Sequence, residues 1–222
     1  MKNIIAIIMG GLFLFTSVFA DSTNVGLKLG SATMEAKGTS TDNDAATINH
    51  SAKEGDFTLP SVFVERQFDG SGAFSFAVGL DLVPMTAEID KLGGGDGFDT
   101  TLSAENLVTG YIQPMYSVSD KMTVYGKVGY SYGDLEFTDI KRQASTGAKG
   151  PASTDKPSKA LQGTMFGIGV QMNSDASGLF NAVRFEATHT NFDEIKHTNS
   201  NSKKLTADAE MDVLSFQLVK SF

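Results

Sequence analysis

Apolar and polar residues alternate along much of this chain, which is the spacing of a β-strand with one apolar and one polar face. The clearest run lies at residues 74–82, and similar runs lie at 122–131 and 166–170. In the first run, one face carries Phe74, Phe76, Val78, Leu80 and Leu82, and the other carries Ser75, Ala77, Gly79 and Asp81. The pattern predicts eight strands, near residues 23–34, 57–68, 73–84, 103–117, 121–137, 160–172, 179–192 and 206–222.

The connections between these strands alternate in length. Short turns are expected at 69–72, 119–120 and 173–178, and long polar loops at 35–56, 85–102, 138–159 and 193–205. Short turns on one side and long loops on the other are typical of an outer-membrane barrel with both termini in the periplasm. Each strand also reaches the roughly 9–11 residues that a tilted transmembrane strand needs. The predicted fold class is therefore all-β, an eight-stranded antiparallel up-and-down transmembrane β-barrel.

A water-soluble barrel of the lipocalin type is the alternative, and it would turn its apolar faces inward. Two features favour the membrane barrel. Charged residues fall on the less apolar faces, at Asp81, Lys127, Arg184 and Glu186. Aromatic residues fall near strand ends, where the girdles of membrane barrels lie: Phe68, Phe74, Tyr116, Tyr132, Phe192 and Phe222.

Both ends of the chain indicate export to the outer membrane. Lys2, an apolar run and Ser17-Val18-Phe19-Ala20 predict a signal peptide over residues 1–20, cleaved after Ala20. One barrel domain, residues 21–222, is then expected to follow. The last strand places four apolar side chains on one face and ends on an aromatic residue, which is the form of a C-terminal barrel-assembly signal: Leu214, Phe216, Leu218 and Phe222.

Charge and composition exclude several classes of function. Of 18 Lys and Arg residues, Lys2 is lost with the leader, so that 17 remain against 26 Asp and Glu and the net charge is −9, which argues against nucleic acid. The chain has no cysteine, which excludes disulfides, thiolate metal sites and cysteine nucleophiles. A single G-G-x-G-x-D motif at residues 94–99 resembles a calcium turn, but such sites are built from stacked repeats, so it is interpreted as a loop tip. No metal or cofactor is expected.

The strand chemistry resembles that of the small eight-stranded barrels of the opacity-protein and OmpA transmembrane-domain type. The resemblance covers the mature chain and is carried by residues 122–130, 183–186, 190–193 and the terminal Phe222. Lys220 departs from the apolar or aromatic residue that the family has two positions before the end. The resemblance implies insertion by the barrel-assembly machinery into a membrane containing lipopolysaccharide. The periplasmic peptidoglycan-binding domain of OmpA-type proteins is expected to be missing, because the chain ends on the last strand.

The interior of such a barrel is narrow enough for side chains to fill it, so no wide pore is expected. Asp81, Lys127, Arg184 and Glu186, with Glu65, are the candidates for an internal network of ion pairs. The same residues could instead line a gated path for ions.

Function beyond the barrel is expected in the loops, through envelope integrity or contact with a surface ligand. Residues 35–56 are rich in acid, whereas 141–160 are rich in base and could meet lipopolysaccharide phosphates or a surface polymer. The alternative, which the charge pattern favours, is a solvated loop whose charge serves solubility. A rim enzyme is disfavoured, because no serine has a nucleophile context near His50, His189 or His197. A conduit for small hydrophobic molecules is the third class, because Pro60 and Pro114 could interrupt the ladder and open the wall.

Overall fold

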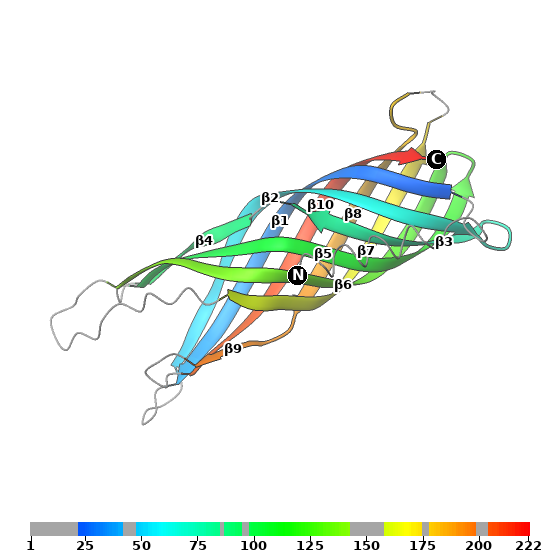
Figure 1. Cartoon of the computed structure of the whole chain (residues 1–222). Coiled ribbons are helices and arrows are strands. Elements are labelled where there is room, and N and C mark those ends of the chain that lie inside the picture. Colours follow the sequence, from blue (N-terminus) through cyan, green and yellow to red (C-terminus); the bar gives the residue numbers. More distant parts are fainter. Residues whose placement is uncertain are drawn as a thin grey trace.

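The computed structural model describes residues 22–41, 48–84, 87–94, 98–142, 158–174, 178–198 and 204–222. Over these residues the chain forms one closed antiparallel barrel (Figure 1). Its strands are β1 (Ser22–Thr41), β2 (Ile48–Asp69), β3 (Phe74–Val83), β4 (Ala87–Gly94), β5 (Phe98–Ser119), β6 (Met122–Arg142), β7 (Ser158–Asn173), β8 (Ala182–Phe192), β9 (Ile195–Thr198) and β10 (Lys204–Ser221). Within the described ranges, no helix is long and apolar enough to cross a bilayer.

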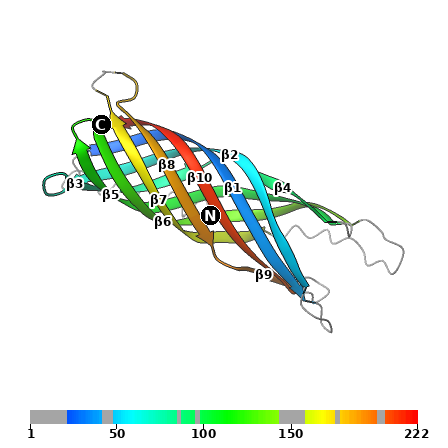
Figure 2. The same cartoon turned by 180° about the vertical axis from the view of Figure 1, so that it is seen from behind.

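Eight strands make up the barrel wall, which confirms the predicted fold class. The order around the wall is β1-β2-β3-β5-β6-β7-β8-β10, and a ladder between β1 and β10 closes the ring. β4 continues β3 along β5, and β9 continues β8 along β10, so neither adds a wall strand of its own. Figure 2 shows β8, β10, β1 and β2 side by side from behind.

The start of β1 and the C-terminus lie at the same end of the barrel. The backbone N–H of Thr23 donates to the carbonyl of Phe222 at 3.1 Å, and the N–H of Phe222 donates to the carbonyl of Thr23 at 2.9 Å. The ends of β2 and β3, of β5 and β6, and of β7 and β8 that short connections join also lie at this end. For a barrel in the outer membrane, this arrangement makes it the periplasmic end.

The long loops predicted at the opposite end are wrong in extent. β1 and β2 pair as far as Ser40↔Ile48, and β5 and β6 pair as far as Phe98↔Arg142. Residues 87–94 and 195–198 also form strands where loops were expected. Apolar alternation is required only inside a bilayer, whereas backbone pairing continues beyond it, so the pattern missed these hairpin extensions.

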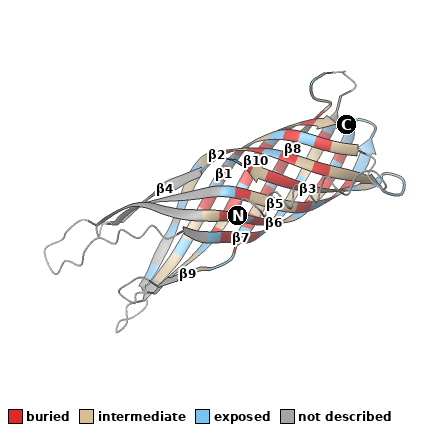
Figure 3. Ribbon diagram, viewed as in Figure 1, coloured by how far each residue is buried: buried red, intermediate tan, exposed pale blue. Residues whose placement is uncertain are grey.

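Buried and exposed residues alternate along the described parts of the wall strands (Figure 3). The exposed positions carry mostly apolar side chains, and the charged side chains Glu65 and Arg184 are among the buried ones. Leu27 and Ile168 point outward and are 52% and 72% exposed, whereas Arg184 and Glu65 point inward and are fully buried. Neighbouring outward residues form ring pairs, such as Phe185 and Phe216 with centroids 5.3 Å apart. This polarity is the reverse of a soluble barrel and suits a wall that faces lipid.

Candidate functional site

The inward-facing side chains change in kind along the barrel axis. On β8, the inward positions from the periplasmic end are Arg184, Glu186, Thr188, Thr190 and Phe192. This series passes from ions through hydroxyls to an aromatic ring. β5 follows the same order, whereas β3 passes directly from a carboxylate to an apolar side chain. The interior therefore has a charged layer and an apolar chamber, and on some strands buried hydroxyl groups, which we call the hydroxyl belt, lie between them.

One half of the charged layer is built on Arg184. Its Nη1 donates to Glu65 Oε2 at 3.0 Å, and its Nη2 donates to Glu65 Oε1 at 2.5 Å. The Nε atom donates to Gln171 Oε1 at 2.6 Å. Glu65 also accepts from Asn24 Nδ2 and from the Tyr111 hydroxyl, each at 2.9 Å. The buried carboxylate and the guanidinium therefore both have several partners, which a buried ion pair needs.

The other half is built on Glu186. Its carboxylate forms an ion pair with Lys127, lies 3.3 Å from Lys28 Nζ and accepts from the Tyr125 hydroxyl at 3.2 Å. Lys28 Nζ also donates to Asp81 Oδ2 at 2.8 Å. Three cations thus face three carboxylates, and the layer has no net formal charge.

The charged layer fills the lumen. Its members come from wall strands all around the barrel, and the Lys127 ammonium also lies 4.3 Å from the centre of the Tyr111 ring. We call this set, with Tyr111 and Tyr125, the charged plug: Lys28, Glu65, Asp81, Lys127, Arg184 and Glu186. A hydrated solute cannot pass unless these side chains move.

Two glycines make room for the tyrosines of the plug. A Cβ atom on Gly79 would lie 2.5 Å from the Tyr111 ring, and one on Gly169 would lie 2.3 Å from the Tyr125 ring. Each ring therefore lies directly on a neighbouring strand, and its hydroxyl reaches a carboxylate in the lumen. This close approach explains why the inward faces carry glycine.

The structure brings together all four charged residues singled out in the sequence, namely Asp81, Lys127, Arg184 and Glu186. Sequence reasoning missed Lys28, although Lys28 stands between Leu27 and Leu29 as Asp81 stands between Leu80 and Leu82. The same alternation would have placed it inside.

The hydroxyl belt separates the plug from the chamber. Thr109 and Ser131 are buried there, with their hydroxyl oxygens 2.8 Å apart. On β5, Thr109 is the inward residue between Tyr111 of the plug and Leu107 of the chamber.

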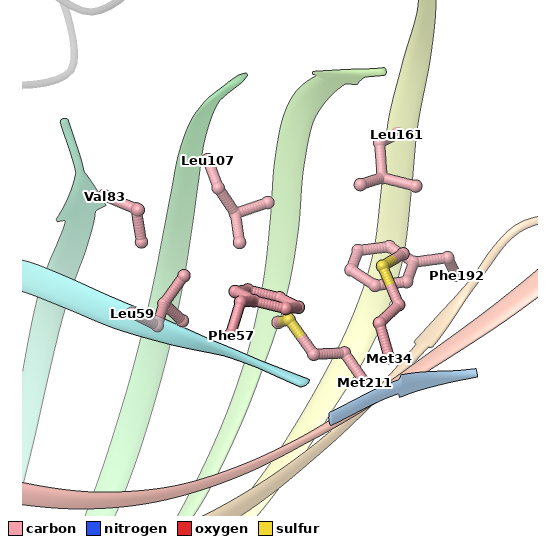
Figure 4. A pocket seen from close by; sticks show the side chains of 8 residues that line it. All are labelled: Met34, Phe57, Leu59, Val83, Leu107, Leu161, Phe192 and Met211. Atoms are coloured by element: carbon pink, nitrogen blue, oxygen red, sulfur yellow. The ribbon is translucent and has the colours of Figure 1, made fainter. Parts of the chain in front are cut away.

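Apolar side chains line the chamber at the extracellular end of the barrel wall (Figure 4). The chamber is defined by Met34, Phe57, Leu59, Val83, Leu107, Leu161, Phe192 and Met211. Met34 and Met211 are register partners on β1 and β10, and both sulfur atoms point into the chamber, where the two Phe rings also lie. The remaining cavity is about 10 Å³, about the size that holds one water molecule.

The wall beside the chamber contains a seam. The β2–β3 ladder ends at Val62↔Leu82, and its register would place Pro60 opposite Pro84. Beyond this point β2 pairs with β1, whereas β4 pairs with β5, and no ladder joins β2 to β4 in the described residues. We call this unpaired border between the two strands the β2–β4 seam. Proline has no N–H to donate, which accounts for the end of the ladder at this level.

The two prolines singled out in the sequence therefore differ in their effect. Pro60 keeps its pairing with Leu29 on β1 and lies at the β2–β4 seam. Pro114 keeps its pairing with Phe76 on β3, but pairing with β6 is interrupted around it, between Ile112↔Val128 and Met115↔Tyr125.

No catalytic arrangement is found among the described side chains. His189 Nδ1 lies 2.8 Å from Asp212 Oδ1 on the outside of the wall, and the side chains of His50 and His197 lie outside the described set. Beyond the membrane, a hydrogen bond to Glu194 raises the pKa of Lys196. Among the residues that the structure describes, no group of three or more His, Cys, Asp or Glu side chains could hold a metal ion.

Other predictions fall partly or wholly outside the described residues. The signal peptide and its cleavage after Ala20 do so, and so do residues 95–97 of the glycine-rich motif and residues 143–157 of the basic loop. The four residues of the predicted assembly signal lie within the described part of the chain. Leu214, Phe216 and Phe222 are exposed on the outer face, and Leu218 is half-buried beside them.

No protein-family model matches the chain, and no curated protein matches it. Solved structures do show similarity. Neisserial surface protein A is 11% identical with a TM-score of 0.48, covering 90% of this chain and 97% of that chain. The outer membrane protein OprG from Pseudomonas aeruginosa is 15% identical with a TM-score of 0.44, covering 91% and 98%.

The attachment invasion locus protein Ail of Yersinia pestis is also similar, at 9% identity and a TM-score of 0.36, covering 87% of this chain and 98% of that chain. The resemblance noted in the sequence, to small eight-stranded barrels, is confirmed at the level of the fold by the wall strands themselves. The function proposed below is therefore argued from the interior residues of this chain and not from these similar structures.

Proposed function

We propose that this chain is an outer-membrane β-barrel that takes up small apolar molecules in its extracellular chamber. The observation that carries the proposal is the chamber itself, where seven of the eight wall strands contribute apolar side chains above a closed plug. A lumen that served only as a polar core would not need eight apolar residues in one layer. An apolar ligand would gain about 25 cal/mol for each Å² of apolar surface it buries there.

The membrane location is supported by the outward apolar faces and by the short turns at the end that holds both β1 and the C-terminus. Export and assembly are expected from the leader over residues 1–20 and from the C-terminal strand. Lipopolysaccharide and phospholipid would then surround the wall.

A bound molecule needs more room than the present cavity gives, so ligand uptake requires side-chain movement. Met34 and Met211 suit this role, because methionine has three flexible bonds and fills spaces of irregular shape. Rotation of Phe57 or Phe192 would widen the same space.

The charged plug stands between the chamber and the periplasm, so release is proposed to be sideways. The β2–β4 seam lies beside Leu59 and Val83, which belong to the chamber. An apolar molecule leaving there would enter the hydrocarbon of the bilayer without crossing the ion pairs.

Binding of the fluorescent apolar probe N-phenyl-1-naphthylamine to the refolded protein tests the proposal. Leu59→Gln places an amide in the chamber and is expected to weaken binding at least fivefold, because a buried polar group without partners costs about 1–3 kcal/mol. Met115→Gln is the control, since Met115 is buried inside the barrel but outside the chamber. Equal binding by both variants and the wild type would contradict the proposal.

Envelope integrity or surface contact is a second candidate function. It is supported by the hairpins that extend beyond the chamber, as far as Ser40↔Ile48 and Phe98↔Arg142. Replacing residues 143–157 by a short Gly-Ser linker tests it, since this function would be lost while probe binding by the chamber would remain.

A further inference from the structure

An open apolar groove runs across the outer face of the wall, on the strands β5, β6, β7 and β8. Its volume is about 680 Å³, within the range of about 300–1,000 Å³ that is usual for small-molecule sites. Large side chains form its rim, and Phe74, Ile168 and Leu214 there are 63%, 72% and 68% exposed. The groove faces lipid if the barrel spans a membrane.

Small residues and an interrupted ladder create the groove. The β5–β6 register places Pro114 opposite Gly126, and these two residues are not paired in the ladder between β5 and β6. A Cβ atom on Gly126 would meet only Pro114 Cγ at 3.9 Å and the Gly167 carbonyl oxygen at 4.0 Å, so the position has space for a side chain. Ala187 contributes a small side chain to the neighbouring part of the floor and leaves further space there.

The floor of the groove includes residues whose side chains point into the lumen. Tyr125 and Glu186, which point into the lumen, contribute to its lining. The Tyr125 ring lies against Gly169, where a Cβ atom would be only 2.3 Å away. Both residues are buried, with Tyr125 5% and Glu186 1% exposed, so a ligand in the groove would lie on the wall outside the lumen.

Two lysines lie toward the periplasmic end on the strands that border the groove. Lys121 is exposed in the β5–β6 turn, five residues before Gly126. That separation corresponds to about 12 Å along the membrane normal for a tilted strand. Lys220 faces outward near the end of β10, and its Nζ donates to the Gly178 carbonyl at 3.3 Å.

These dimensions match those of one membrane leaflet, whose hydrocarbon is about 15 Å thick. A phosphate at the level of Lys121 and Lys220 would place an acyl chain alongside Pro114 and Gly126. We propose that the groove holds one acyl chain of an anionic glycerophospholipid whose phosphate lies beside Lys121, at the level at which Lys220 adds a second positive charge. The proposal depends on the membrane location argued above.

Shape and charge, rather than hydrophobicity, give this site its selectivity. Bulk acyl chains are as apolar as the groove, so burial alone does not favour one lipid over another. The open space at Gly126, which we call the notch, lets an acyl chain pack more closely than it does against the rest of the wall. Each lysine near the surface favours an anionic headgroup about fivefold.

Native mass spectrometry of the refolded full chain, extracted from mixed vesicles of phosphatidylglycerol and phosphatidylcholine, tests the proposal. The wild type is expected to retain one phospholipid, with phosphatidylglycerol favoured at least fivefold. Gly126→Leu fills the notch and should abolish retention. Gly110→Leu is the matched control, because Gly110 is also lipid-facing and a Cβ there would meet only Leu80 Cδ2 at 3.7 Å.

The headgroup is tested by a second matched pair. Lys121→Gln should reduce the preference for phosphatidylglycerol about fivefold, whereas Lys196→Gln removes the same charge at the opposite end and should leave it unchanged. The proposal is overturned if Gly126→Leu retains lipid as the wild type does, if both lipids are retained equally, or if the groove instead mediates a dimer that Gly126→Leu dissociates.

Two measurements on the same samples separate this site from the proposed function. A heat-modifiable shift on gels reports whether each barrel has folded and inserted. A wild type that never inserts overturns the membrane location and the lipid site together. Probe binding without lipid retention overturns the lipid site alone.

Discussion

Arg184 on β8 and Glu65 on β2 form two hydrogen bonds across the lumen, 3.0 Å from Nη1 to Oε2 and 2.5 Å from Nη2 to Oε1. β10 and β1 stand between these two strands in the wall, so the pair joins strands that share no ladder. Both side chains are fully buried. The contact ties opposite parts of the barrel together and closes the lumen at the same point.

Removing the negative partner should destabilise the barrel strongly. Glu65→Gln leaves the Arg184 guanidinium buried without a counter-charge, and the expected loss is about 3–5 kcal/mol in the free energy of unfolding. Urea unfolding in lipid vesicles, followed by circular dichroism, measures it. Glu194→Gln breaks an exposed pair with Lys196 and should change stability by less than about 1 kcal/mol. A similar small loss in both variants would contradict the role given to the buried pair.

The plug should also prevent steady ion flow. In planar bilayers the wild type is expected to show no stable conductance, because ion pairs span the lumen. Lys127→Ala removes one cation and leaves Glu186 with less neutralisation, so brief cation-selective openings are expected. Lys196→Ala, outside the lumen, should stay silent. Stable openings in the wild type would instead support the gated ion path.

Sequence alone was sufficient for the wall and for most of the plug. Charges such as Asp81 and Arg184 stand out because they interrupt otherwise apolar runs, and the period of two then places them inside. The chamber was not predicted, because its inward residues are as apolar as the outward ones. At Leu107-Val108 and at Leu82-Val83 the alternation disappears, so sequence gives no sign of which face looks inward.

The tyrosines of the plug should be sensitive to small changes in the glycines beneath them. Gly169→Ala would place a Cβ atom 2.3 Å from the Tyr125 ring and displace it from Glu186. Overpacking of this kind costs about 1–3 kcal/mol, measurable by urea unfolding. Gly126→Ala adds the same methyl group into open space and should be neutral. Equal stability of the two variants would contradict the packing described here.

The terminal Phe222 is expected to act in assembly rather than in stability. Its side chain is 76% exposed, while its backbone holds β1 through Thr23. Phe222→Ala should therefore refold in vitro as the wild type does but reach the outer membrane of expressing cells in several-fold lower amounts. Quantifying heat-modifiable barrel in membrane fractions checks this, and a parallel loss of refolding in vitro would instead indicate a packing role.

The central claim is that the chamber receives small apolar molecules and releases them sideways through the β2–β4 seam. Pro60→Val combined with Pro84→Val restores two backbone donors at the point where the β2–β3 ladder ends. The measurement is the rate at which N-phenyl-1-naphthylamine passes from protein in vesicles into the surrounding bilayer. We predict that the double variant binds the probe normally but releases it several-fold more slowly than the wild type, and an unchanged release rate with an extended ladder would contradict the claim.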